Sequence, residues 1–231
     1  MTNPFQVVKD FEAALCDYTG APYCVTTTSC TMALLLAVAW RLRGTNALYS
    51  RSISDRVWEQ KEGPPIVEIP KHTYVGVPMS IIHAGGRPTF RDEDWRGMYE
   101  LKPLNIWDSA RWLAGRIWEH PNVSPRREQQ MICLSFHWAK TLGVQQGGAI
   151  LHADKAADKW LRMARFDGRQ EGVQPKDQKD WIIGHHAYMS PETAAAGLVR
   201  LALLPQNTAP LPWGPGTDSD YPNLSQMEIF K

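Results

Sequence analysis

The sequence contains no apolar segment long enough to cross a membrane. Its longest apolar run extends over nine residues, from Met32 to Trp40, whereas a membrane-spanning helix needs about 20. Cysteine is also scarce, and the four cysteines show none of the spacings that are typical of metal ligands. We therefore predict no membrane span and no metal site. Because no signal-like segment precedes the first cysteine, we expect reduced thiols and a cytoplasmic location.

The sequence also has no excess of charge of either sign. Its 231 residues include 25 basic and 24 acidic residues, which give a formal net charge of +1. This balance provides no electrostatic basis for binding nucleic acid or a membrane surface. With 43% hydrophobic and 21% charged residues, the composition is typical of a globular protein with a packed core. The length suits one sizeable α/β domain.

The sequence does contain alternating helical and strand patterns. Helices are predicted at residues 4–18, 31–42, 75–83, 109–113, 155–165 and 191–204, and strands at 23–25, 65–69, 87–90, 105–107, 130–135 and 149–151. This alternation predicts an α/β fold with a mostly parallel sheet flanked by helices. Residues 205–231 contain five prolines and are expected to form an irregular arm. The arm would pack on its own domain, pack on a partner subunit or stay mobile.

One segment combines a hydroxyl, an imidazole and an amine just after a predicted strand. The apolar residues 131–134 run directly into Ser135, His137 and Lys140. In open α/β sheets, ligands bind at the carboxyl ends of the strands. A lysine that is desolvated in such a crevice has a lowered pKa and becomes nucleophilic toward carbonyl groups. A surface lysine without a special role is the alternative interpretation.

Four other segments could contribute to the same site. Residues 26–31 are rich in Ser and Thr and lead into an apolar helix, a pattern typical of a phosphate site or of an ordinary N-cap. Asp108 follows a short apolar run, so its carboxylate could hold a protonated ring nitrogen or cap a helix. Tyr74 could stack on a flat ring or belong to the core. The adjacent His185 and His186 could be ligands, general bases or loop residues.

Taken in order, these segments resemble the DegT/StrS family of aminotransferases that use pyridoxal phosphate (PLP) and often act on sugar nucleotides. The resemblance extends from about Phe11 to Leu204. The segments that carry it are Ser29-Cys30-Thr31-Met32-Ala33-Leu34, Pro70 to Gly76, Ile82 to Phe90 and Ser135-Phe136-His137-Trp138-Ala139-Lys140. It implies the fold-type-I architecture of the family's large PLP-binding domain for residues 1–204. Residues 205–231 would then stand where the family has a smaller C-terminal domain.

The resemblance also implies roles for individual residues around the cofactor ring. Lys140 would bind PLP covalently as a Schiff base and would act as the acid–base group of the reaction. Asp108 would pair with the pyridine nitrogen, and Tyr74 would stack on the ring. The phosphate would be held by Ser135 and by backbone amides at Cys30 and Thr31.

Three of the positions that depart from the family pattern concern residues expected at the site. Cys30 stands where the family usually has glycine, and its side chain is expected to crowd the turn. Arg111 stands where the family commonly has His or Gln, and could bind an anionic group of the substrate. His186 stands where an asparagine reaches the cofactor phosphate of the neighbouring subunit, and could still donate a hydrogen bond there. With His137, Arg111 completes the set of expected substrate-binding residues.

The expected function follows from this resemblance. A PLP-dependent aminotransferase would move an amino group from a donor such as glutamate to a keto group on a sugar-like or nucleotide-linked acceptor. A PLP enzyme of another type, such as a decarboxylase or lyase, is one alternative. A degenerate, non-catalytic subunit that binds PLP or a partner is the other. Under any of these, we expect a homodimer with the site at the subunit interface.

Overall fold

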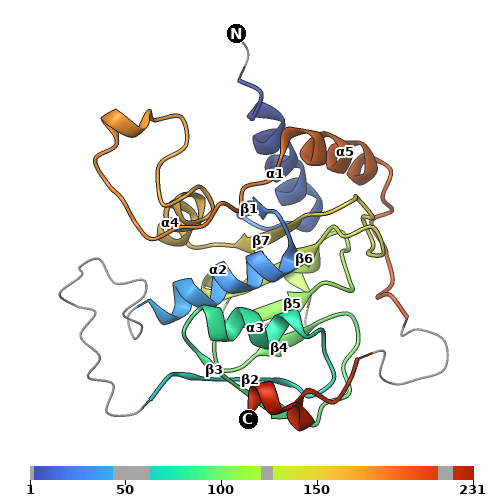
Figure 1. Cartoon of the computed structure of the whole chain (residues 1–231). Coiled ribbons are helices and arrows are strands. Elements are labelled where there is room, and N and C mark those ends of the chain that lie inside the picture. Colours follow the sequence, from blue (N-terminus) through green and yellow to red (C-terminus); the bar gives the residue numbers. More distant parts are fainter. Residues whose placement is uncertain (1–2, 44–62, 121–126, 213–220) are drawn as a thin grey trace.

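The computed structural model describes residues 3–43, 63–120, 127–212 and 221–231. It has helices on both sides of a central sheet (Figure 1). The α-helices are α1 (Gln6–Thr19), α2 (Cys30–Leu42), α3 (Gly76–His83), α4 (Lys155–Arg165) and α5 (Pro191–Ala202). The strands are β1 (Tyr23–Thr27), β2 (Ile66–Pro70), β3 (Arg87–Arg91), β4 (Tyr99–Leu101), β5 (Ile106–Ser109), β6 (Met131–Ser135) and β7 (Gly148–His152). Short 3-10 turns lie at Ile117–Glu119, Arg127–Gln129, Pro175–Asp177, Leu224–Gln226 and Glu228–Phe230.

The α/β class is confirmed, but the sheet is mixed where the sequence predicted a mostly parallel one. The five-stranded sheet has the order β1-β7-β6-β5-β4. Within it β5 and β6 pair in parallel, whereas β1–β7, β6–β7 and β4–β5 are antiparallel. The connections explain this, because residues 136–147 join β6 to β7 through turns, and a strand reached without a crossover returns antiparallel.

The strands β2 and β3 form a separate parallel pair beside this sheet. One antiparallel bridge joins the two sheets, since the N–H groups of Glu68 and Lys102 each bind the other residue's carbonyl, at 2.8 and 3.0 Å. The pair therefore lies next to β4, at the edge of the five-stranded sheet.

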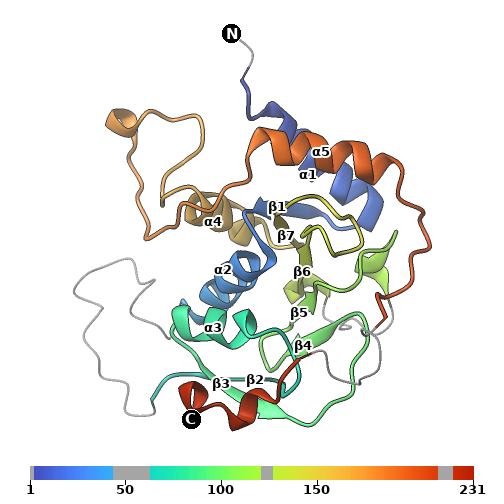
Figure 2. The ribbon, with the colours of Figure 1, turned by 45° about the vertical axis from the view of Figure 1, so that its right-hand side comes forward.

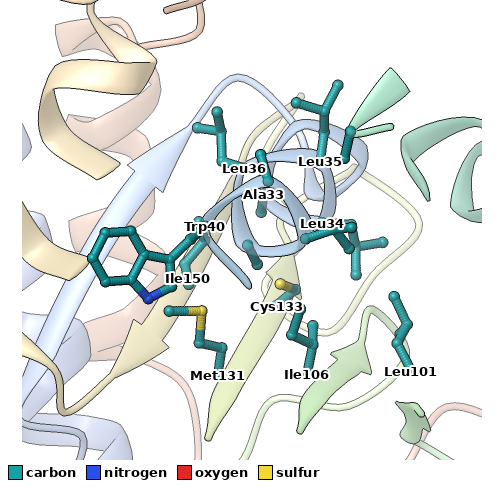
Figure 3. Close-up of a cluster of buried hydrophobic side chains, with 14 of the residues drawn as sticks. Ala33, Leu34, Leu35, Leu36, Trp40, Leu101, Ile106, Met131, Cys133 and Ile150 are labelled. Atoms are coloured by element: carbon teal, nitrogen blue, oxygen red, sulfur yellow. The ribbon is translucent and has the colours of Figure 1, made fainter. Parts of the chain in front are cut away.

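Alternate residues of the central strands enter two separate cores. Met131 and Cys133 pack against the apolar helix α2, while Ile132 and Leu134 face α1 and α5. Figure 3 shows the first core, where Trp40 and its neighbours on α2 cover Met131 and Cys133. This alternation is the side-chain period of a strand with both faces buried. It explains why α2 is apolar all round, since α3 and α4 pack on it as well as the sheet.

On the opposite face, α5 lies across α1 (Figure 2). Gly197 makes this close approach possible, because a Cβ at that position would lie 2.5 Å from the Phe11 ring. Phe11 is fully buried and contacts Phe136, with ring centroids 5.4 Å apart. Phe136, which follows β6, is thereby packed against α1.

The sheet's outer strand, β1, is covered by charged side chains from α1 and α4. Glu12 accepts the N–H of Thr26 at 2.9 Å, and Arg165 donates to the carbonyl of Thr26 at 2.6 Å. Arg162 donates to the carbonyl of Cys24 at 3.1 Å and to Glu12 at 2.7 Å. These side chains take the place of a neighbouring strand and protect the edge from pairing with other chains.

The helix predicted at residues 109–113 is wrong. Ser109 is the last residue of β5, and a single turn follows, in which the N–H of Trp112 binds the carbonyl of Ser109 at 3.2 Å. The next backbone groups bind the C-terminal segment instead of a helix. Leu211 donates its N–H to the Arg111 carbonyl at 2.9 Å, and Trp112 Nε1 donates to the Thr208 carbonyl at 2.8 Å.

The last described residues, 221–231, pack beside β2 and β3, at the lower edge of Figure 1. The N–H of Leu224 binds the carbonyl of Lys71 at 2.9 Å, and the Leu224 side chain is fully buried. Phe230 contacts Phe90, with ring centroids 5.8 Å apart. The C-terminal segment therefore rests on this chain's own fold at two places, residues 205–212 and 221–231.

Among the residues that the structure describes, no helix combines the length and the apolar character needed to span a bilayer. Within the same residues, no cluster of His, Cys, Asp and Glu side chains is arranged to hold a metal ion.

Candidate active site

A cavity of about 480 Å³ lies at the ends of β5 and β6, next to the start of α2. All but one of the site residues predicted from the sequence line it. They are Cys30, Thr31, Tyr74, Asp108, Arg111, Ser135, His137 and Lys140. The strand-end position of the Asp and Lys segments brings them together, although 32 positions separate Asp108 from Lys140.

The wall at α2 is a tight turn that directs the helix N-terminus into the cavity. Ser29 is extended, and its Oγ accepts the N–H of Met32 at 3.1 Å, so it is the N-cap. The first amides of the helix have no carbonyl one turn earlier to bind, and the helix dipole adds partial positive charge there. An anion in the cavity would meet these amides.

Close packing at this turn depends on Gly148 rather than on residue 30. A Cβ at residue 148 would lie 2.5 Å from the backbone nitrogen of Cys30 and from the carbonyl carbon of Ser29. The cysteine side chain, which the sequence predicted to crowd the turn, is 9% exposed and packs in the core under α2. Gly148 on β7 thus provides the space that lets the turn lie against the sheet.

Asp108 lies at the bottom of the cavity and is 5% exposed. Its Oδ1 accepts the N–H of Ala110 at 2.9 Å, and its Oδ2 accepts the hydroxyl of Tyr99 at 2.7 Å. Burial raises the pKa of Asp108 above its ordinary value, because a buried charge is poorly solvated. The hydrogen bonds from Tyr99 and Ala110, and the charge of Lys140, offset part of that rise.

Lys140 follows β6 at the end of a short turn, in which its N–H binds the carbonyl of His137 at 2.8 Å. Burial lowers the pKa of Lys140, and the nearby charge of Arg111 lowers it further. Asp108 and Cys30 act in the opposite direction. A larger fraction of the amine is therefore neutral, and so nucleophilic, at a given pH than for a lysine in water.

Aromatic side chains form the opposite wall of the cavity. Tyr74, in the segment after β2, is 55% exposed, and its ring centroid lies 6.5 Å from that of Tyr221. Trp95 is 7% exposed, and its Nε1 donates to the carbonyl of His72 at 2.9 Å. The nearby Nδ1 of His72 lies 3.1 Å from the carbonyl oxygen of Tyr221. The C-terminal segment thus supplies part of the cavity wall.

The two expected substrate-binding residues lie at the rim. Arg111 lines the cavity, and its guanidinium donates to the carbonyl of Pro212. His137 is exposed, and its Nδ1 accepts the N–H of Ala139 at 3.3 Å. Ser135 Oγ lies 3.5 Å from the N–H of His137. Amide, hydroxyl and guanidinium groups therefore surround the mouth of the cavity.

His186 does not line this cavity. Its Nδ1 lies 3.1 Å from the carboxylate of Asp167, and its side chain is 73% exposed. Within one chain, His186 therefore takes no part in the site that the other predicted residues form.

Sequence reasoning missed Tyr99, Thr73, Trp95 and Tyr221. The first three belong to the segments around β4 and after β2, and β4 has three residues, too short for a periodic pattern to show. Tyr221 belongs to the proline-containing arm, and no motif in the arm's sequence indicated that it would line the cavity.

The chain matches the model of the DegT/DnrJ/EryC1/StrS aminotransferase family over residues 1–106 and 127–210. The chain belongs to this family. Among solved structures it is similar to a DegT DnrJ EryC1 StrS aminotransferase from Brucella abortus, with 21% identity and a TM-score of 0.62. That match covers 85% of this chain and 58% of the other.

Two further structures of similar fold carry names of specific enzymes. The sugar aminotransferase CalS13 from Micromonospora echinospora is 18% identical, with a TM-score of 0.60, and the match covers 85% of this chain and 60% of that one. PseC from Helicobacter pylori, an aminotransferase involved in the biosynthesis of pseudoaminic acid, is 17% identical, with a TM-score of 0.61 and coverages of 85% and 57%. At these identities the likeness shows the fold alone.

A search of curated proteins finds no match. The chain spans 57–60% of the length of the three solved structures named above. Cys30 and Arg111 lie at the cavity, Cys30 within the matched residues and Arg111 between the two matched ranges, whereas His186, also within them, lies outside the cavity. The departures from the family pattern are thus divided between the site and the surface.

Proposed function

We propose that this chain is a PLP-dependent aminotransferase. It would transfer an amino group from a donor such as glutamate to a keto group on a sugar-like or nucleotide-linked acceptor. The observation that supports this most directly is the meeting of Lys140, Asp108 and the N-terminus of α2 in one cavity. Membership of an aminotransferase family adds to it. We assign residues 1–204 to the PLP-binding domain and residues 205–231 to an arm on it.

The residues of the cavity fit PLP in charge and in shape. The hydrogen bonds to Asp108 come from neutral donors, Tyr99 and the N–H of Ala110. A protonated ring nitrogen would therefore add the cation that a buried carboxylate needs. The start of α2 would hold the phosphate together with Ser135, and Gly148 keeps that turn close to the sheet. Tyr74 offers its exposed ring for stacking.

When bound, PLP would supply an electron sink that lets a proton leave the α carbon of an amino donor. Lys140 Nζ would hold the cofactor through its carbonyl carbon, with loss of water, and, after the amino donor has displaced it, would take up and return that proton. Burial and the charge of Arg111 lower the pKa of Lys140, which favours the neutral amine that both roles require. Arg111 and His137 at the rim would bind the anionic and hydroxyl groups of the substrates.

We also propose that the enzyme is a homodimer with its site at the subunit interface. His186 is exposed and lies outside the cavity of its own chain, so a second copy would be needed to bring it to the phosphate. Two-fold homodimers are the commonest oligomers. Light scattering after gel filtration tests this, and a monomer that binds PLP with full affinity would refute the role of His186. The four free cysteines suit a cytoplasmic enzyme.

The experiment that tests the proposed function is visible absorption of the purified protein with PLP, before and after addition of glutamate. Wild type is compared with Lys140→Ala and with Lys176→Ala, which removes an exposed lysine that does not line the cavity. We expect a visible band that glutamate abolishes in wild type and in Lys176→Ala, but no such band in Lys140→Ala. A Lys140-dependent band that glutamate leaves unchanged would favour another donor or another PLP reaction. The absence of any such band in wild type would refute the PLP assignment and favour a non-catalytic subunit.

A further inference from the structure

Two buried hydroxyl groups, those of Thr73 and Tyr99, form a chain of hydrogen bonds that ends at the Asp108 carboxylate. Thr73 Oγ1 lies 2.6 Å from the hydroxyl of Tyr99, and that hydroxyl lies 2.7 Å from Asp108 Oδ2. The exposed fractions are 1% for Thr73, 2% for Tyr99 and 5% for Asp108. The roles proposed above treat the Tyr99 hydroxyl only as a neutral donor to Asp108 and give Thr73 no part.

The direction of these hydrogen bonds follows from the charge on Asp108. An ionised carboxylate can only accept, so Tyr99 donates its single proton to Asp108 Oδ2. The oxygen of Tyr99 is then an acceptor, and Thr73 is the donor to it. Burial and the adjacent charge of Asp108 raise the pKa of Tyr99 well above its ordinary value, so the hydroxyl keeps the proton that it donates.

The position of Tyr99 is fixed by the surrounding structure. On β4 it pairs directly with Asp108 on β5. The ring of Trp95 contacts the ring of Tyr99 edge-on, with centroids 4.6 Å apart, and Trp95 is itself held by the carbonyl of His72. With the Ala110 N–H on Oδ1, each oxygen of Asp108 has one donor from the protein. The plane of the carboxylate is therefore set before any ligand arrives.

We propose that Tyr99 is a positioning residue which, together with Thr73, orients the Asp108 carboxylate toward the ring nitrogen of the cofactor. The part that concerns the cofactor rests on the proposed function, whereas the effect on Asp108 itself does not. A hydrogen bond to the charged form of an acid favours that form. Because burial already raises the pKa of Asp108, loss of the Tyr99 hydroxyl should raise it further and weaken the ion pair with a ring nitrogen.

The first test uses the protein without cofactor. The carboxyl carbon signal of Asp108, assigned with Asp108→Asn, is followed by carbon-13 NMR as a function of pH. We expect Tyr99→Phe to raise the pKa of Asp108 by about one unit, the effect of one hydrogen bond to a charged group. Thr73→Val should shift it in the same direction by less, and Thr73→Ser, which keeps the hydroxyl, should match wild type. An unchanged pKa in well-folded Tyr99→Phe would overturn the proposal.

The second test separates orientation toward the ring nitrogen from a general structural effect. Fluorescence titration measures the Kd of PLP and of a PLP analogue with carbon in place of the ring nitrogen. We expect Tyr99→Phe to weaken PLP binding about tenfold and to leave the analogue's Kd unchanged. In the Asp108→Asn background, Tyr99→Phe should have no further effect on PLP. Equal loss of both ligands, or an additive effect in that background, would overturn the proposal.

The two tests distinguish failure of this inference from failure of the proposed function. If wild type binds neither PLP nor its analogue, the proposed function fails, and the NMR titration still decides whether Tyr99 controls Asp108. Circular dichroism and thermal unfolding establish that each variant is folded. If Tyr99→Phe is too unstable, Thr73→Val compared with Thr73→Ser takes its place, with a smaller shift expected in the same direction, because valine removes the hydroxyl that donates to Tyr99 and leaves the Tyr99 ring unchanged.

Discussion

Replacing Glu12 with glutamine should strongly destabilise the fold, because it removes the only carboxylate shared by Arg162 and Arg165 within the described network. Glu12 Oε2 accepts from Arg162 at 2.7 Å, and Oε1 binds Arg165 together with the backbone and side chain of Thr26. The glutamine amide would place an N–H₂ group against one of the guanidinium groups. Both arginines would keep their charge, since Arg stays protonated in proteins.

The magnitude follows from the burial of the two partners. Removing one member of a buried ion pair costs about 3–5 kcal/mol. Arg165 is 1% exposed but retains Glu171 at 2.8 Å, so its charge keeps one partner. Arg162, with its side chain 29% exposed, keeps Asp158 and some solvent. We therefore expect a loss at the lower end of that range, about 3 kcal/mol.

The assay is equilibrium unfolding in urea at neutral pH. With a slope of about 2–3 kcal/mol per molar urea, the unfolding midpoint of Glu12→Gln should fall by about 1 M. The matched control is Glu228→Gln, which makes the same chemical change at an exposed ion pair with Lys231. Exposed pairs contribute roughly 0–1 kcal/mol, so the control should shift the midpoint little.

The pH dependence of this difference provides a second check. Burial by itself raises the pKa of Glu12, but the charges of Arg165 and Arg162 and their hydrogen bonds outweigh it, and the pKa lies below the ordinary 4.5. A lowered folded-state pKa stabilises the fold fully above the unfolded value and less as the pH falls through the folded value. The difference in unfolding free energy between wild type and Glu12→Gln should thus be constant near neutral pH and should become smaller below about pH 4.5. The reasoning would be refuted if Glu12→Gln shifted the urea midpoint no more than Glu228→Gln does. It would also be refuted if the difference in unfolding free energy between wild type and Glu12→Gln persisted in acid.

Three further predictions concern the cavity. Gly148→Ala should cost about 1–3 kcal/mol in unfolding free energy and weaken PLP binding, because the new Cβ would lie 2.5 Å from a backbone nitrogen of the turn that begins α2; unchanged thermal unfolding would contradict this. Arg111→Gln should raise the pKa of Lys140, since it removes a positive charge that lowers it; mass spectrometry of Lys140 acetylation by acetic anhydride across pH measures the shift, and an identical pH profile would argue against it. Tyr221 forms part of the cavity wall, so with Tyr221→Ala the glutamate concentration that halves the visible band should rise by about threefold or more. Ile229→Ala, at a 66% exposed position of the same segment, should leave that concentration unchanged, and equal effects of the two variants would disprove a specific role for Tyr221.

The local elements could be predicted wherever capping and periodicity agree. The helix expected at residues 155–165 is α4 over the same residues, because Asp154 caps it and accepts the N–H groups of Ala156 and Ala157. The start of α2 was predicted within one residue for the same reason, since Ser29 or Thr31 was expected to cap it, and the structure shows that Ser29 is the cap. These signals act within a few residues of chain, so they are readable without the fold.

Much of the candidate site was also predictable, because its residues follow strands. Lys140 comes shortly after β6 and Asp108 lies near the end of β5, and adjacent parallel strands bring their ends to the same edge of the sheet. The segments in order also matched a family pattern. Whether these residues act as proposed remains a prediction for the absorption experiment.

The tertiary structure decided what depends on contacts between distant segments. Strand direction could not be predicted, because β6 and β7 pair antiparallel through a connection whose turns show no periodic pattern. Tyr99 is a partner of Asp108 because the three-residue strand β4 pairs with β5. Tyr221 reached the cavity because Leu224 and its neighbours pack on the segment after β2, about 150 positions away in sequence. Sequence thus determined the elements and the reactive groups, through local hydrogen bonds and side-chain period. The pairing of segments far apart, which long-range packing stabilises, determined how those groups are held.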